Sequence, residues 1–81
     1  QRRRLQPMRD KLRRLELKLE KLSDEQQALE LELAEPAIYQ EVNKPQLQAL
    51  LSRKIELDRS LETTEEAWIQ AGEALESASE D

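Results

Sequence analysis

Two rows of leucine-type residues, spaced by alternating steps of three and four, run along the two halves of this chain. The first row is Leu5, Met8, Leu12, Leu15, Leu19, Leu22, Gln26, Leu29 and Leu33. The second row is Leu47, Leu50, Lys54, Leu57, Leu61, Thr64, Trp68, Ala71 and Leu75. This spacing marks the a and d positions of a heptad repeat, whose side chains share one face of a helix. Each row therefore predicts a long helix that buries a single narrow seam.

The second row matches the first when it is read backwards. If the chain folds back between Leu33 and Leu47, the residue numbers of each facing pair sum to 79 or 80. The polar members Gln26 and Lys54 then face each other instead of burying against leucine, which would cost their hydrogen bonds to water. A polar pair of this kind fixes the register of a coiled coil. We therefore expect an all-α fold in which two long helices form an antiparallel coiled-coil hairpin.

Prolines and a capping residue set the predicted bounds of the helices. Pro36 ends the first helix because it disfavours helical geometry in Glu35 and cannot donate the next hydrogen bond. Asn43 can cap the second helix, whose first turn tolerates Pro45, and Pro7 marks the start of the first helix. We expect helix one at about 7–34 and helix two at about 44–78. The connection at 35–45 is short, contains proline and can hold one helical turn. All three segments belong to a single domain of residues 1–81.

Apolar residues outside the two rows divide into a tip group and an outward-facing group. Ile38, Tyr39 and Val42 recur at short helical spacing in the connection, and we expect them to cover the end of the hairpin. Trp68 is expected to pack in the core opposite Leu12 rather than to form a binding platform. Four aliphatic residues fall on outward heptad positions and are candidate contacts for a protein partner: Leu17, Leu31, Ile55 and Ile69.

Composition restricts the class of protein. Charged residues make up 38% of the chain, which contains one glycine and no phenylalanine, histidine or cysteine. So few large apolar groups favour a two-helix coiled coil over a globular core. Without histidine or cysteine there is no thiolate nucleophile, no imidazole base and no ordinary zinc site, so we expect no enzymatic activity, no metal and no cofactor in this chain. Burial in a single narrow seam offsets little more than the cost of ordering 81 residues, so we expect an appendage of a larger protein, and a first residue of Gln1 rather than Met supports this expectation.

Charge is distributed unevenly along the chain. Residues 1–22 contain nine basic and three acidic residues, whereas residues 23–81 contain four basic and fifteen acidic residues. On the heptad, the basic residues of helix one form a continuous row on the g and c positions, which we name the basic stripe. The facing g positions of helix two are small. The basic stripe consists of Arg4, Lys11, Arg14, Lys18 and Lys21, and it faces Ser60, Ala67 and Ala74.

A row of cations without facing carboxylates predicts contact with a phosphate backbone. The alternative interpretation is a solvated helix face, because runs of charge are common on coiled coils. No aromatic residues alternate with the cations, so any contact is expected to follow the shape and backbone of the nucleic acid. The candidate nucleic-acid-binding residues are Arg4, Lys11, Arg13, Arg14, Lys18 and Lys21.

Several segments also share a pattern with a known family. They are the leucine run from Leu12 to Leu33, the loop Ala34-Glu35-Pro36-Ala37-Ile38-Tyr39, the leucine series from Leu47 to Leu61, and the late Glu66-Ala67-Trp68. On these segments the chain resembles the C-terminal domain of bacterial ABC-F ATPases, most closely of the YheS type. The resemblance covers nearly the whole chain, and the Pro-Ala-Ile-Tyr loop and the late Ala-Trp are its most specific marks.

The resemblance implies a cytoplasmic parent protein with two ATP-binding cassettes and no transmembrane domain, which acts on the ribosome during translation. ATP and magnesium would bind to the cassettes, so no nucleotide-site residue is assigned to this chain. The resemblance also implies that the tail binds nucleic acid, ribosomal RNA or DNA, and the basic stripe is where such binding would map. The alternative is a protein-interaction or spacer arm that contacts a protein partner or the parent's cassettes. We expect a monomer, with self-association through the same seam as the alternative.

Overall fold

The computed structural model consists of two long helices and a short connection. Helix α1 spans Arg2–Ala34 and helix α2 spans Lys44–Glu80; the 3-10 turns η1 (Pro36–Tyr39) and η2 (Glu41–Asn43) join them. The structure describes the backbone of residues 2–80 and the side chains of residues 5–80. No strand occurs in the described part of the chain. The predictions of an all-α fold and of two long helices are therefore confirmed.

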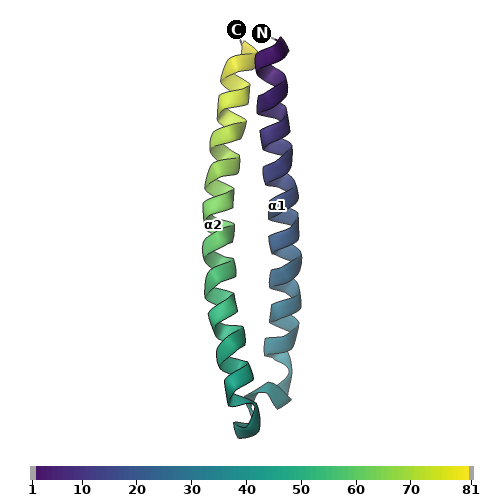
Figure 1. Ribbon diagram of the computed structural model, residues 1–81, viewed down its shortest axis with the longest axis vertical. Helices are drawn as coiled ribbons and strands as arrows, with labels where there is room; N and C mark the ends of the chain where they lie inside the picture. Colours follow the sequence, from purple (N-terminus) through teal and green to yellow (C-terminus); the bar gives the residue numbers. More distant parts are fainter. Residues whose placement is uncertain (1, 81) are drawn as a thin grey trace.

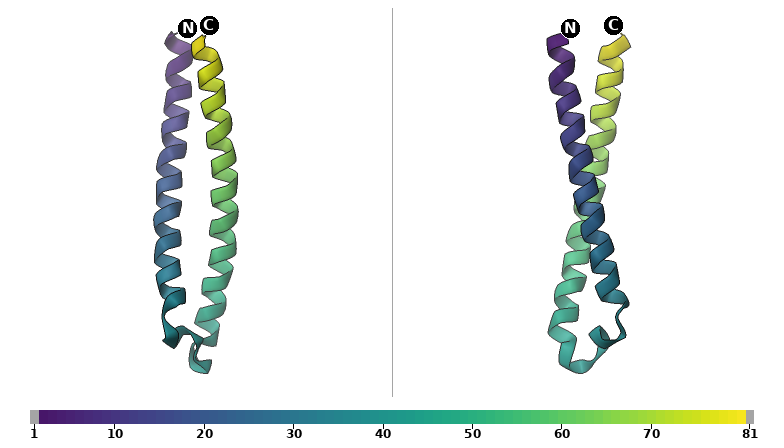
Figure 2. Two further views of the ribbon diagram at one scale, coloured as in Figure 1. Left: turned by 180° about the vertical axis from the view of Figure 1, so that it is seen from behind. Right: turned by 90° about the vertical axis from the view of Figure 1, so that its right-hand side faces the viewer.

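The two helices lie side by side and run in opposite directions, so that the start of α1 and the end of α2 are at the same end of the molecule (Figure 1). The right-hand view of Figure 2 shows the helices crossing, with the connection at the far end. The resulting rod measures 61 × 15 × 14 Å. A rod of this width has one layer of side chains between the helices, so nearly all apolar packing is in the seam.

The predicted seam contains most of the buried side chains. Leu57, Thr64 and Ala71, spaced by seven residues on the d positions of α2, are 1%, 3% and 8% exposed. Leu29 of α1 is 6% exposed. Trp68, on an a position, is 39% exposed, so the prediction that it packs in the core was wrong. An indole is too wide for a narrow two-helix seam, and its ring lies at the edge, where Nε1 donates a long hydrogen bond of 3.5 Å to Glu16 Oε2.

Helix α1 begins five residues earlier than the predicted position 7, and Pro7 lies inside the helix. The first four amides of any helix have no intrahelical partner, so a proline near the start removes few backbone hydrogen bonds. Pro7 is the sixth residue of α1, so it removes one backbone hydrogen bond from the helix. Leu5 is accordingly helical and half-buried at the end of the seam.

The connection is closed by one apolar side chain and two polar ones. Ile38 is 6% exposed, whereas Tyr39 and Val42 are 60% and 80% exposed, so only Ile38 of the three predicted residues covers the hairpin end. The Tyr39 hydroxyl instead donates to the Leu33 carbonyl at 2.6 Å. Asn43 Nδ2 donates to the Ala37 carbonyl at 2.8 Å, so its side chain ties η1 to η2 rather than capping α2 as predicted.

A polar layer crosses the seam where the sequence predicts the pair Gln26 and Lys54. Both side chains donate to one carboxylate: Gln26 Nε2 lies 3.1 Å from Asp58 Oδ1, and Lys54 Nζ lies 2.8 Å from Asp58 Oδ2. Asp58 therefore joins the two predicted partners. The hydrogen bond from Lys54 lowers the pKa of Asp58, and the hydrogen bond to Asp58 raises the pKa of Lys54. Directly beside this layer, Arg53 binds Glu25 of α1 at 2.6 Å and Glu56 of its own helix at 3.2 Å.

This layer predicts a pH dependence of stability. Because the folded-state pKa of Asp58 is depressed, its contribution is present above about pH 4 and is lost as the pH falls through the folded pKa. The contribution of Lys54, whose pKa is raised, is present below about pH 10 and is lost at higher pH. We expect the difference in unfolding free energy between the wild type and Asp58→Asn, measured by urea titration, to shrink below pH 4. Asp24→Asn, a matched change at an exposed carboxylate outside this layer, is the control.

Candidate nucleic-acid interface

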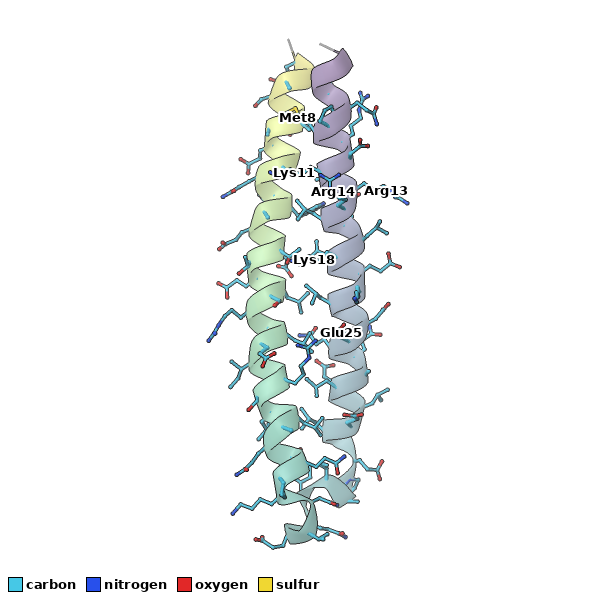
Figure 3. All side chains as sticks on the ribbon, viewed as in Figure 1. Met8, Lys11, Arg13, Arg14, Lys18 and Glu25 are labelled. Atoms are coloured by element: carbon cyan, nitrogen blue, oxygen red, sulfur yellow. The ribbon has the colours of Figure 1, made fainter. Side chains whose placement is uncertain are left out.

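The described cations of the basic stripe lie on one strip of α1. Lys11, Arg14, Lys18 and Lys21 are all exposed. A helix turns by about 100° per residue, so steps of three and four keep these four side chains within about 80° of each other around the axis. Figure 3 shows Lys11 and Lys18 along the line between the two helices. The four side chains can therefore contact one extended ligand together.

Carboxylates do not neutralise this strip. Within the part of the chain whose side chains are described, every ion pair involves Arg53 or Lys54 and lies nearer the connection. Glu25 occupies the next g position after Lys18 and binds Arg53, so this ion pair marks where the cationic strip ends. None of the described cations of the basic stripe forms an ion pair with a described side chain.

The α2 surface beside the basic stripe is small and uncharged for most of its length. Lys11 lines a groove of about 330 Å³ together with Met8, Ala67, Gln70, Ala71 and Ala74. Lys18 lines a second groove of about 250 Å³ together with Arg59, Ser60, Thr63 and Thr64. No carboxylate lines either groove. The structure thus brings Ser60, Ala67 and Ala74 next to the cations, in the order that the heptad predicts, and adds Arg59.

Two of the sequence-predicted site residues are not part of this strip as described. Arg13 is about 200° around the helix from Lys11, and Figure 3 shows it extending outward from α1. Arg4 belongs to α1, but its side chain lies outside the described residues. Sequence analysis missed Arg59, because it is on an f position and the heptad pattern gives no signal that its side chain lines the groove. The described interface therefore contains Lys11, Arg14, Lys18, Lys21 and Arg59.

Most carboxylates of α2 lie on the remaining sides of the helix. Seven occupy e, b and f positions, whereas Glu56 is on a c position and binds Arg53. The seven are Asp58, Glu62, Glu65, Glu66, Glu73, Glu76 and Glu80. The rod is 15 Å across, and charges in 0.15 M salt are screened over about 8 Å. The two sides of the rod are therefore electrostatically distinct at physiological salt, although the acidic side weakens the positive potential in dilute buffer.

Among the described residues, no group of three or more acidic side chains is arranged to hold a metal ion. Neither described helix contains a stretch long and apolar enough to cross a membrane. In comparisons with known proteins, no family model, no curated protein and no solved structure matches the chain.

Proposed function

We propose that this chain is a noncatalytic coiled-coil arm that contacts the phosphate backbone of ribosomal RNA or DNA through the basic stripe. The observation that carries the proposal is the face formed by Lys11, Arg14 and Lys18, which form no ion pair with any described side chain. Lys11 and Lys18 line grooves without carboxylates. Ion pairs at these positions would neutralise the positive charge that a phosphate ligand would otherwise contact. An unpaired row of cations along a rigid helix is suited to a linear polyanion.

The dimensions of this face fit a backbone ligand. Lys11 and Lys21 are ten residues apart, which is about 15 Å along a helix. The alanines and hydroxyl residues of α2 leave room for a phosphate chain between the helices, and Ser60, Thr63 and Gln70 add neutral donors for phosphate oxygens. No residue with an aromatic ring lines this face, so base stacking is not part of the proposal. Binding should therefore show little preference for sequence.

We further propose that the arm belongs to a bacterial ABC-F ATPase, as its C-terminal domain. The Pro-Ala-Ile-Tyr loop at Pro36–Tyr39 and the late Ala67-Trp68 support this proposal. In such a parent the arm would help to position the ATPase on the ribosome in the cytoplasm, while ATP and magnesium would bind to the cassettes. The residues of this chain would then contribute binding and no chemistry.

The proposed function predicts a specific response to charge reversal. We expect labelled duplex DNA and structured ribosomal RNA to bind the chain at low salt in fluorescence anisotropy titrations. The double variant Arg14→Glu/Lys18→Glu should weaken binding by tenfold or more, because two phosphate contacts are replaced by repulsion. With four cations contacting phosphates, the logarithm of the binding constant should fall with the logarithm of salt concentration with a slope of about −4.

The chain supplies a matched control for this experiment. Arg9→Glu/Arg13→Glu makes the same change in net charge on the same helix, but on the side away from the basic stripe. We expect this control to weaken binding by about twofold at most. Equal losses in the two double variants would mean that only net charge matters. The absence of binding at low salt would refute the proposed contact with nucleic acid.

A protein-interaction or spacer arm is the second candidate function. The observation that favours it is the exposure of aliphatic side chains on the outer surface, which agrees with the sequence prediction. Contacts of this kind should persist as salt is raised, in contrast to phosphate contacts. The exposed side chains are Leu17 (50%), Leu31 (74%), Ile55 (59%) and Ile69 (50%).

A further inference from the structure

A third groove lies on the side of the seam away from the basic stripe. Its apolar lining consists of Leu19, Leu61, Trp68 and Ile69, and its volume is about 600 Å³. It shares no lining residue with the grooves beside Lys11 and Lys18. This groove is therefore independent of the proposed nucleic-acid interface.

The groove is open because the seam is covered unevenly. The d-position residues Leu57, Thr64 and Ala71 of α2 are at most 8% exposed. By contrast, Trp68 on an a position is 39% exposed, and its neighbour Ile69 is 50% exposed. Two helices thus close one side of the seam and leave large apolar side chains accessible on the other. A third helix packed along this side would cover them as in a three-helix bundle.

The charge around this groove selects the occupant. Asp58, Glu62 and Glu65 line it, and no lysine or arginine does. Asp58 and Ile69 are eleven residues apart, a distance of about 16 Å along α2, which corresponds to about three turns of a helix. A short helix whose apolar face is flanked by cations matches the groove in length, polarity and charge.

We propose that this groove binds a basic amphipathic helix of a protein partner. The apolar face of that helix covers Trp68 and Ile69, and its lysines or arginines bind the carboxylates of Glu62 and Glu65, since Asp58 is already bonded to Gln26 and Lys54. The proposal does not depend on nucleic-acid binding, which uses the other side of the rod. Loss of one interaction should leave the other unchanged.

The fluorescence of Trp68 can report binding at this groove, because Trp68 is the only tryptophan in the chain. We would titrate the chain with a synthetic amphipathic helix built from leucine and lysine, and with a leucine–glutamate peptide of the same pattern as control. The leucine–lysine peptide should shift the emission of Trp68 to shorter wavelength and protect it from acrylamide quenching. The leucine–glutamate peptide should do neither, because its charge has the same sign as the groove.

Two variants test whether the peptide occupies this groove. Ile69→Ser should weaken binding about tenfold because it removes an apolar contact next to Trp68. Ile55→Ser is the matched control, since Ile55 has the same heptad position and is 59% exposed but does not line the groove. Glu62→Lys/Glu65→Lys should abolish binding while leaving the helical circular dichroism unchanged, because both side chains are exposed.

Three results would overturn the proposal. Equal responses to the two peptides would show that charge does not select the ligand, and an equal loss in Ile55→Ser would place binding elsewhere. A shift of Trp68 emission with protein concentration alone, with a dimer in sedimentation, would identify a second copy of this chain as the occupant. If nucleic-acid binding fails but the peptide results are as expected, the groove proposal stands by itself.

Discussion

Replacing Leu57 with alanine is expected to lower the free energy of unfolding by about 3 kcal/mol, the middle of the range for buried leucines. Leu57 is 1% exposed at the d position of α2. The seam is one layer deep, so no second layer of side chains can move in to fill the space. Small domains are stable by about 5 kcal/mol, and this single change would remove most of that stability. Urea denaturation followed by circular dichroism would measure the effect.

Leu51→Ala is the matched control for this experiment. Leu51 belongs to the same helix, but it is 46% exposed on an e position outside the seam. Its truncation should cost less than about 1 kcal/mol, because much of the side chain is already in water. If both variants lost equal stability, the helices would have to pack with α2 rotated about its axis. The pair of variants therefore tests the register as well as the energy.

Replacing Ile38 with alanine is expected to have the second largest effect, a loss of about 2 kcal/mol. Ile38 is the buried apolar residue of the connection, where it is 6% exposed. Without it, η1 and η2 should open, and amides held by short-range hydrogen bonds should exchange faster. The two amides to follow by hydrogen exchange are Gln40, bonded to Ala37 at 3.2 Å, and Asn43, bonded to Gln40 at 2.9 Å.

Val42→Ala serves as the control in the same connection. Val42 is 80% exposed, so its truncation should change stability by less than about 0.5 kcal/mol and leave both amides protected. If Ile38→Ala also left them protected, the connection would be held by polar contacts instead. Those contacts are the bond from Tyr39 to the Leu33 carbonyl and the bond from Asn43 to the Ala37 carbonyl.

Heptad spacing was sufficient to predict the two helices and the burial of Leu29, Leu57, Thr64 and Ala71, because one periodic signal specifies both. It was insufficient for Trp68, since spacing contains no information about whether a side chain of that width fits a narrow seam. The start of α1 was misjudged because Pro7 can either begin a helix or lie in its first turns. Asp58 was missed because a residue on an e position reaches the polar layer only through its side-chain rotamer, which the sequence does not show.

The candidate sites differ in how much of them the sequence predicts. The basic stripe depends on the period of α1 alone, so Lys11, Arg14, Lys18 and Lys21 could be grouped without a structure. Arg13 was included because it is adjacent in sequence, although adjacent residues do not face the same way on a helix. The groove at Trp68 could not be predicted, because it depends on how unequally the a and d positions are covered.

The position of both helix ends at one end of a 61 Å rod gives the molecule the mechanics of a lever. A support that holds those ends turns a small change of angle into a sideways displacement that grows with distance along the rod. The described basic stripe lies in the half nearer the pivot, where such displacement is small, and the groove at Trp68 lies near the middle of the rod. Tyr39 and Val42, exposed at the opposite end, would travel farthest.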